Sequence, residues 1–280
     1  MLQDPVELTT AIAAGPGRIG LVVEYDGGGF HGWQDQKSSI RTIGGTLAAA
    51  VSRVANEPVE PVCAGRTDSG VHACYQLVHF DTGASRAIRS WVLGINSALP
   101  ADIRVHWAGN VASDFSARFT AHSRRYRYVM LDTPTPPALL RGRVAWTHTP
   151  LDADAMHQAA QYLPGEQDFS AFRAAGCQAN SPWRCIEAAT VYREGPFLVL
   201  DIAANAFLHH MVRNIAGTLM AVGHGERHPE WVAELLCQRD RRRAGITAPP
   251  QGLYLVDIGY PEQCGVPRPR LGPWWLSGNL

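Results

Sequence analysis

The sequence predicts an α+β protein made of two tandem copies of one β-α-β-β-α-β unit. Apolar segments of strand length alternate with amphipathic segments of helix length along the 280 residues. Their order in the first half is that of the ferredoxin-like unit, and the second half repeats it. We expect the two units to pack around a central cleft, because the connection between them is short and carries aromatic residues.

The first unit is predicted over residues 19–109, after a mobile N-terminal tail over residues 1–18. Its strands are expected at residues 19–25, 59–64, 74–80 and 103–108, and its helices at residues 42–56 and 86–98. Ser85 is the expected N-cap of the second helix, because a serine hydroxyl can accept a hydrogen bond from the first-turn amides.

The second unit is predicted over residues 123–262, between a connection at residues 110–122 and a C-terminal tail at residues 263–280. Strands are expected at residues 123–131, 186–193, 197–203 and 253–260, and helices at residues 152–163, 206–222 and 229–237. The helix over 206–222 is predicted from apolar residues at every fourth position. They are Phe207, Met211, Ile215 and Leu219.

Bulk charge does not indicate a polyanionic partner, because the formal net charge is +0. Local clusters do: 25 residues are basic, and Lys37 is the only lysine among them. The arginines concentrate at Arg118, Arg124, Arg125 and Arg127, and again over residues 239–243. Arginine binds phosphate bidentately, so the first cluster is expected to bind phosphates. A generally arginine-rich proteome would produce the same bias.

The six cysteines contain no C-x-x-C pair, which indicates reduced thiols in a chain of this size. The N-terminus lacks a basic segment followed by an apolar one, and no apolar run approaches the length of a membrane span. We therefore expect a cytoplasmic protein that does not enter a membrane.

The most informative stretch for chemistry is the loop around Asp68. This carboxylate lies between Gly65 and Gly70, with Arg66 two residues before it and His72 four residues after it. The glycines permit positive φ, so Asp68 is expected to project from a loop that joins two strands. The structural alternative is an Asx-turn, in which the carboxylate only bonds its own backbone.

Three other motifs give weaker predictions of function than the Asp68 loop does. Residues 27–32 match Gly-x-Gly-x-x-Gly after a strand, but the next helix starts some ten residues too late to bind a dinucleotide. His209 and His210 fall on the predicted helix and point about 100° apart, so we expect no metal site there. Ser69 and His72 lack an orienting acid for a nucleophilic triad.

A set of sequence blocks carries a family likeness from about residue 19 to residue 260. The blocks are Glu24–Gly27, Gly32–Gln34, Gly65–His72, Phe115–Phe119, Arg124–Tyr128, Asp168–Phe169, His209–Asn214 and Gly252–Leu255. Through them the chain resembles the tRNA pseudouridine synthase A family (TruA). The resemblance implies the pseudouridine synthase fold, with a catalytic cleft between the units. It also implies an isomerase that converts uridine to pseudouridine at positions 38, 39 or 40 of the tRNA anticodon stem-loop.

The family likeness further implies a homodimer that acts on tRNA without a cofactor or a metal. Asp68 matches the nucleophile. Substrate-binding roles are implied for Tyr126, Arg66, Arg213 and Leu253. By this likeness Tyr126 contacts the target base, Arg66 helps to flip it, and Arg213 pairs with the aspartate. Contacts with tRNA are implied for Arg86, for Phe115, Ser116, Ala117, Arg118 and Phe119, and for Gly176, Cys177, Gln178, Ala179 and Asn180.

Simple chemistry agrees with these roles, because moving the uracil from N1 to C5 needs a carboxylate and a base-holding group but no redox input. Structural alternatives exist: Tyr126 as a core aromatic and Arg213 on a solvated helix face. The sequence departs from the family at Gly44 and Gly45, where side chains are usual, which weakens the first helix. Two other functions stay open, a tRNA-binding protein without catalysis and an oxidoreductase built on the Gly27 loop.

Overall fold

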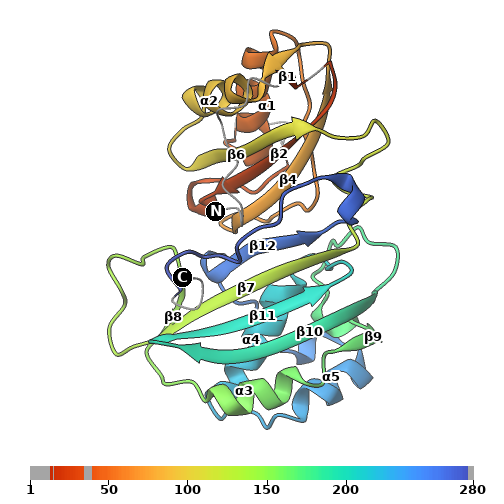
Figure 1. Cartoon of the computed structure of the whole chain (residues 1–280). Coiled ribbons are helices and arrows are strands. Elements are labelled where there is room, and N and C mark those ends of the chain that lie inside the picture. The colour runs from red at the N-terminus through yellow and green to blue at the C-terminus, as the bar shows by residue number, and fades with distance from the viewer. Residues whose placement is uncertain (1–12, 15, 35–39, 277–280) are drawn as a thin grey trace. The chain divides into compact units, whose positions relative to one another are not determined.

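The computed structural model describes residues 13, 14, 16–34 and 40–276, which Figure 1 traces as a ribbon. Packing divides these residues into two units. The first holds the described residues up to His122 together with Leu255–Trp275, and the second holds Ser123–Tyr254 and Leu276. Residues 1–12 and 15 of the predicted N-terminal tail, and residues 277–280 of the predicted C-terminal tail, lie outside the described residues.

The sheet of the first unit has the strand order of a ferredoxin-like unit. Its strands are β2 (Gly17–Tyr25), β3 (Val62–Cys63), β4 (His72–Thr82) and β6 (Ile103–Asn110). The order is β6-β2-β4, with β3 on the far side of β4, and every pairing is antiparallel. The last strand therefore lies beside the first, and the first beside the third, as the predicted β-α-β-β-α-β order requires.

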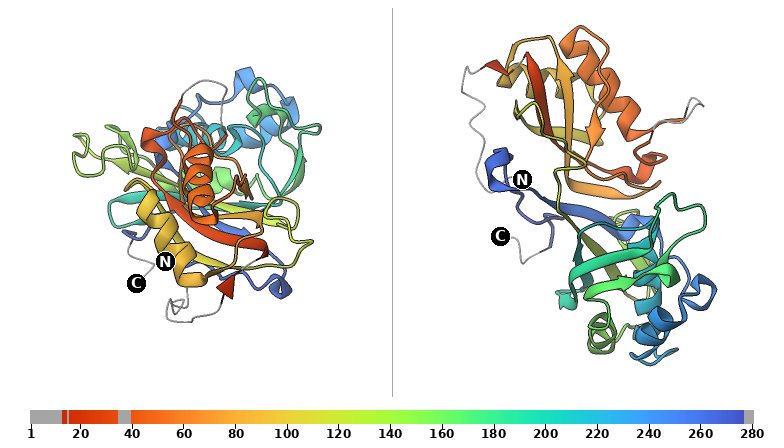
Figure 2. Two further views of the ribbon diagram at one scale, coloured as in Figure 1. Left: turned by 90° about the horizontal axis from the view of Figure 1, so that it is seen from above. Right: turned by 90° about the vertical axis from the view of Figure 1, so that its right-hand side faces the viewer.

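Two helices, α1 (Ile43–Ala55) and α2 (Ile88–Ala98), pack against each other on this sheet. The right-hand view of Figure 2 shows α1, in orange, on one side of the strands. The Thr42 hydroxyl caps α1, and Asn56 ends it in the left-handed conformation. The expected cap of α2 at Ser85 is wrong: Ala87 occupies the N-cap position without a side-chain bond.

Strand pairing explains that shift at the start of α2. Arg86–Ala87 form the short strand β5, which pairs antiparallel with β1 (Ala13–Ala14). The backbone of these two residues is therefore extended, and the helix starts two residues later than the sequence pattern predicts.

The second unit repeats this arrangement in a larger sheet. Its strands are β7 (Ser123–Asp132), β8 (Ala145–Thr147), β9 (Gly165–Asp168), β10 (Trp183–Glu194) and β11 (Phe197–Ala204). The order β7-β11-β10-β9 is antiparallel throughout, and β8 adds a parallel pairing on β7. The final strand, β12 (Leu253–Gly259), begins in this unit and continues into the first.

Three helices cover one face of the second sheet (Figure 1). They are α3 (Ala153–Ala160), α4 (Met211–Gly223) and α5 (Trp231–Gln238). Short 3-10 turns complete the chain: η1 (Gly27–Gly29), η2 (Ser170–Phe172), η3 (Arg241–Arg243), η4 (Pro250–Gly252) and η5 (Glu262–Cys264). The α+β class and the repeated ferredoxin-like order are confirmed. None of the described helices is both long enough and apolar enough to span a bilayer.

One predicted helix is shorter than its sequence pattern suggested. The pattern placed a helix over residues 206–222, but α4 begins only at Met211. His210 has a φ of 58°, a left-handed conformation that cannot belong to an α-helix. His209 and His210 therefore precede the helix, and their side chains need not point 100° apart as neighbours on a helix do.

Candidate active site

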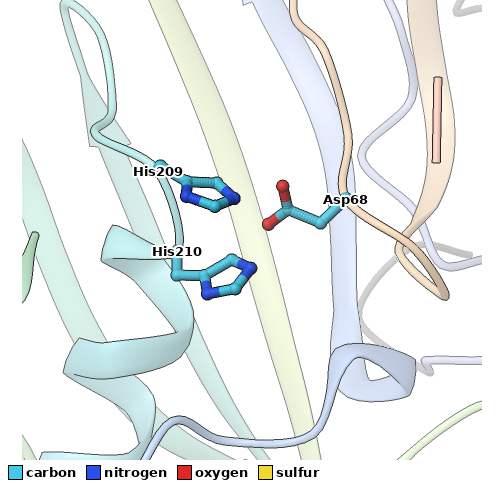
Figure 3. Close-up of side chains that lie close together, drawn as sticks. All are labelled: Asp68, His209 and His210. Atoms are coloured by element: carbon cyan, nitrogen blue, oxygen red, sulfur yellow. The ribbon is translucent and has the colours of Figure 1, made fainter. Parts of the chain in front are cut away.

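Asp68 lies in the loop that leaves β3 after Cys63 and enters β4 at His72. Its side chain is half-buried, whereas the preceding Thr67 is only 6% exposed and Arg66 is exposed. A main-chain hydrogen bond from the Val71 N–H to the Asp68 carbonyl oxygen, 3.1 Å long, closes a turn after the carboxylate. Figure 3 shows the Asp68 carboxylate projecting from this loop, as predicted from the sequence.

A second loop, residues 27–33, holds the Asp68 loop from one side. The N–H of Trp33 donates to the Thr67 carbonyl at 3.0 Å, and the Ser69 hydroxyl donates to the Phe30 carbonyl at 3.1 Å. The Gly70 N–H also donates to Phe30, at 3.3 Å. These bonds tie down the residues on both sides of Asp68, so the carboxylate is carried on a rigid turn.

The glycines of the Gly-x-Gly-x-x-Gly motif serve this contact. A Cβ on Gly27 would lie 1.9 Å from the Val71 carbonyl oxygen, and one on Gly32 would lie 2.8 Å from the Thr67 carbonyl oxygen. Gly32 also has a φ of +82°, which favours glycine. Gly27 and Gly32 are thus explained by close packing against the Asp68 loop, whereas a Cβ on Gly29 would approach the Arg41 guanidinium at 3.2 Å.

Gly44, which replaces a usual family side chain, has a comparable reason. Its N–H donates to the Trp33 carbonyl at 3.0 Å. A Cβ at this position would lie 2.6 Å from the same oxygen. The glycine in the first turn of α1 therefore allows the 27–33 loop to press against the helix.

The predicted tRNA-contact residues of the first unit differ in exposure. Phe115 and Ala117 are buried, at 3% and 0%, while Phe119 is 80% exposed. The Arg118 guanidinium carbon stacks 5.2 Å from the centre of the Phe119 ring. Arg86 is half-buried in β5 and donates to the Ser85 carbonyl. Arg118 and Phe119 thus form an exposed pair that can stack on a base.

His79 holds the 115–119 segment in place. Its Nδ1 accepts a hydrogen bond from the Ala117 N–H at 3.1 Å, and its ring meets Phe115 edge-on. Burial, followed by the charge of Arg18, lowers the pKa of His79, against the opposing effect of Asp81. The neutral imidazole is the form that can accept the Ala117 hydrogen bond.

Tyr126 lies on β7 in the second unit and is 8% exposed. Its ring meets Phe207 edge-on, with 5.2 Å between centroids and 89° between planes. Because side chains alternate along a strand, Arg125 and Arg127 lie on the opposite face. Tyr126 is therefore aimed by an aromatic neighbour on its own face of the sheet.

Both flanking arginines pair with one carboxylate. Asp201, in β11, receives hydrogen bonds from Arg125 at 2.6 and 2.9 Å and from Arg127 at 3.0 Å. The side chains of Arg127 and Asp201 are only 9% and 6% exposed. Arg127 thus forms a buried ion pair with Asp201, whereas the paired Arg125 side chain remains 39% exposed. The expectation that the two arginines bind phosphates stays a prediction.

The second arginine cluster is largely committed to other partners as well. Arg241 donates to Asn214 at 2.9 Å and to Thr247 at 3.0 Å, and Arg239 lies 3.4 Å from Asp168. These contacts join Arg241 to α4 and Arg239 to the end of β9. Arg241 is thus the member of this cluster that is bound into the fold, whereas Arg242 is 89% exposed.

Arg213 and Leu253 have buried surroundings. The Arg213 Nε donates to the Ala248 carbonyl at 2.8 Å, and the Ala248 N–H returns a bond of 3.1 Å to the Arg213 carbonyl. This reciprocal pair fixes the stem of Arg213 on α4, so the residue does not lie on a fully solvated face. Leu253, the first residue of β12, is 5% exposed.

The predicted contact segment at residues 176–180 is shaped by Arg173. This guanidinium donates to the carbonyls of Cys177 and Ala179 at 2.9 and 2.8 Å. Burial acts to raise the pKa of Cys177, but hydrogen bonds from the N–H groups of Ala179 and His209, and from Arg173, lower it overall. The lowered pKa gives Cys177 a larger thiolate fraction than an ordinary cysteine has at the same pH.

His209 and His210 lie side by side just before α4, with 4.0 Å between ring centroids and 35° between planes (Figure 3).

In the 176–180 segment, Gln178 and Asn180 are exposed, as is Gly176. In the second unit, the exposed surface of the 176–180 segment therefore consists mainly of polar and backbone groups.

The predicted site residues divide between the units. The first carries Arg66, Asp68, Arg86 and residues 115–119, and the second carries Tyr126, residues 176–180, Arg213 and Leu253. Sequence reasoning missed the residues that support them, among them Gln76 and Asp201. Both are polar residues at buried strand positions, and this was the available signal.

Comparisons with known proteins agree over almost the whole chain. A family model described as "tRNA pseudouridine synthase" matches residues 21–120 and 159–261. Proteins named tRNA pseudouridine synthase A are 53% identical in Alcanivorax borkumensis, 54% in Aeromonas hydrophila and 51% in Aliivibrio salmonicida. Each alignment covers 94% of this chain, and 98%, 97% and 100% of the respective relatives.

Among solved structures, one described as "Crystal Structure of a Cbf5-Nop10-Gar1 Complex" matches with a TM-score of 0.36 and 12% identity. The match covers 85% of this chain and 49% of that chain. The likeness is too low to add to the sequence comparisons.

Proposed function

The chain belongs to the tRNA pseudouridine synthase A family, and we propose that it isomerises uridine at positions 38, 39 or 40 of the tRNA anticodon stem-loop, with Asp68 as the nucleophile. The enzyme is an isomerase that modifies RNA. The observation that carries the proposal is the Asp68 loop. Its carboxylate projects from a turn whose neighbours on both sides are hydrogen-bonded to the 27–33 loop.

The reaction breaks the bond between C1′ and N1, turns the uracil and joins C1′ to C5, while a proton leaves C5 and N1 gains one. No electrons enter or leave, so the chemistry needs a carboxylate nucleophile, groups that hold the loose base and a base or water that accepts the C5 proton. Asp68 supplies the carboxylate from a rigid turn, which keeps the attacking oxygen near a productive position.

The target base is stacked in the stem-loop and must be extruded before it can react. We assign this step to Arg66, which is exposed two residues before Asp68. Tyr126 contacts the flipped base, Leu253 provides an apolar contact, and Arg213 pairs with the nucleophile. Tyr126 has a fixed ring orientation against Phe207, which suits it to this task.

Contacts with the tRNA backbone and loop are assigned to residues on both units. In the 115–119 segment, Arg118 and Phe119 present their side chains, Ser116 is half-buried, and Phe115 and Ala117 shape the segment from inside. Arg86 and the 176–180 segment supply further contacts. We also propose a homodimer that works in the cytoplasm, where its tRNA substrate is found.

The proposal is tested by mapping pseudouridine in an unmodified tRNA transcript after incubation with the purified protein and only the magnesium that folds the RNA. We expect pseudouridine at one or more of positions 38, 39 and 40, and none in a transcript with cytidine at these positions. Tight tRNA binding without any product would instead favour a binding protein. A requirement for added nicotinamide cofactor or zinc would contradict the proposed chemistry.

A further inference from the structure

Gln76 is a fully buried polar residue that the reaction itself does not explain. It lies on β4 with 0% of its surface exposed, and its backbone pairs with Val23 of β2. Its side-chain amide makes two bonds to the backbone of one residue: Nε2 donates to the Gly65 carbonyl at 2.6 Å, and Oε1 accepts from the Gly65 N–H at 3.3 Å. Both halves of the amide are therefore used at the start of the Asp68 loop.

The register of the sheet shows why an amide is needed at this position. β3 pairs Val62 with His79 and Cys63 with Val78, and the Ala64 N–H continues the ladder to the Leu77 carbonyl at 2.9 Å. The next residue on this register, Gly65, faces Gln76. There the side-chain amide, which carries the same donor and acceptor as a peptide group, takes the place of the main-chain ladder.

A second contact carries the same glutamine to the residue beside Asp68. Nε2 also donates to the Tyr25 hydroxyl at 3.3 Å, and that hydroxyl lies 2.8 Å from the Thr67 hydroxyl. Tyr25 and Thr67 are buried, at 2% and 6% exposed. Gln76 thus fixes Gly65 directly and Thr67 through Tyr25.

We propose that Gln76 is a positioning residue for the Asp68 nucleophile, acting through Gly65 and Thr67. This positioning role depends on the proposed role of Asp68 as the nucleophile. The two fixed residues flank Arg66, and the second is bonded covalently to Asp68, so loss of the amide lets the whole Arg66–Asp68 turn shift. A displacement of about 1 Å at a reacting group can cost about 100-fold in rate.

The first test compares Gln76→Leu with the wild-type enzyme in single-turnover experiments at saturating tRNA. We expect a rate about 100-fold lower, while the Kd for tRNA changes less than about threefold because the exposed contact residues remain. Gln167→Leu is the matched control: this amide donates to the carbonyls of Tyr162, Leu163 and Pro164 in the second unit. The control should turn over at the wild-type rate.

The second test uses Gln76→Glu, which keeps the shape of the side chain. A carboxylate cannot donate to the Gly65 carbonyl, whereas a protonated carboxyl can. The rate of this variant relative to wild type should therefore rise as the pH falls from 8 to 6, because burial favours the protonated form. A variant whose fold is merely destabilised would not recover activity at lower pH. The Gln76→Glu measurement therefore tests the positioning role even if Gln76→Leu does not fold.

Asp68→Asn is measured in parallel to separate the two hypotheses. If Asp68→Asn is inactive and Gln76→Leu reacts at the wild-type rate, the positioning role is overturned and the nucleophile stands. A Gln76→Glu rate ratio that stays flat between pH 8 and 6 also overturns the positioning role. If Asp68→Asn is active, the proposed function of Asp68 falls first.

Discussion

Replacing Asp201 with asparagine should destabilise the second unit strongly, because this carboxylate pairs with two arginines at once. It receives three hydrogen bonds of 2.6, 2.9 and 3.0 Å from Arg125 and Arg127. The asparagine keeps the shape of the side chain and one acceptor oxygen but removes the negative charge. Arg127, which is 7% exposed, would then remain buried and lose the negative charge of Asp201 beside it.

The expected size follows from the burial of this pair. Removing one partner of a buried ion pair costs about 3–5 kcal/mol. Since the amide oxygen still accepts one hydrogen bond, we expect the free energy of unfolding to fall by about 3 kcal/mol, the lower end of that range. For a chain of this size, each kcal/mol lowers Tm by about 2–4 °C, so Tm should fall by about 6–12 °C.

The assay is thermal unfolding followed by circular dichroism, together with tRNA binding at several salt concentrations. Asp240→Asn is the matched control, because Asp240 also pairs with an arginine, Arg242, at 2.8 Å, but Arg242 is 89% exposed. Exposed ion pairs stabilise proteins little, so the control should unfold close to the wild-type temperature. The salt dependence of tRNA binding should be unchanged in both variants.

One result would refute this reasoning. If Asp201→Asn unfolded at the wild-type temperature, the Asp201 network would not stabilise the sheet. If Arg125→Gln and Arg127→Gln each reduced the slope of log K against log salt by about one, these arginines would contact phosphates in addition to pairing with Asp201.

Three further predictions concern Tyr126, His79 and Cys177. Tyr126→Phe should bind tRNA nearly normally but lose about 100-fold in single-turnover rate, because the hydroxyl transfers a proton. Tyr126→Leu should also lose affinity, because stacking on a base contributes about 1–3 kcal/mol. If Tyr126→Phe reacted at the wild-type rate, Tyr126 would act by stacking alone. Because the pKa of His79 is lowered in the folded state, its contribution to stability is complete above the unfolded pKa of about 6.5 and is lost as the pH falls through the folded pKa. The free energy of unfolding should therefore fall less in acid for His79→Gln than for the wild type. Identical dependence of this free energy on pH in the two proteins would contradict the prediction. Iodoacetamide at neutral pH should alkylate Cys177 faster than Cys264, whose pKa is raised by burial, and mass spectrometry showing equal rates would contradict the assigned shifts.

Local patterns in the sequence were sufficient for most elements of the fold. The first helix was predicted over 42–56 and is found at Ile43–Ala55, because Thr42 and Asn56 are strong capping residues. The helix predicted from residue 206 begins at Met211 instead. The apolar pattern extends back to Phe207, but Phe207 packs on Tyr126 from outside the helix, and no periodicity reveals that.

The supporting contacts of the site could not be read from sequence, because their partners are distant along the chain. The arginines at 125 and 127 were expected to bind phosphate, and their partner, Asp201, is 74 residues beyond the second of them. Gln76 bonds Gly65 and Tyr25, and only the folded register brings these three residues together. In contrast, the position of Asp68 on a loop between strands followed from its flanking glycines, the apolar run before them and the alternating run after them.

The central claim is that Asp68 is the nucleophile, and its most direct test is tritium release from tRNA labelled at C5 of uridine. Asp68→Asn keeps the size of the side chain and should preserve the turn, which is closed by the main chain at Val71. We predict that the variant binds tRNA with a Kd near that of the wild type and releases no tritium above background. Substantial release by a preparation of Asp68→Asn verified by mass spectrometry would remove Asp68 from the mechanism.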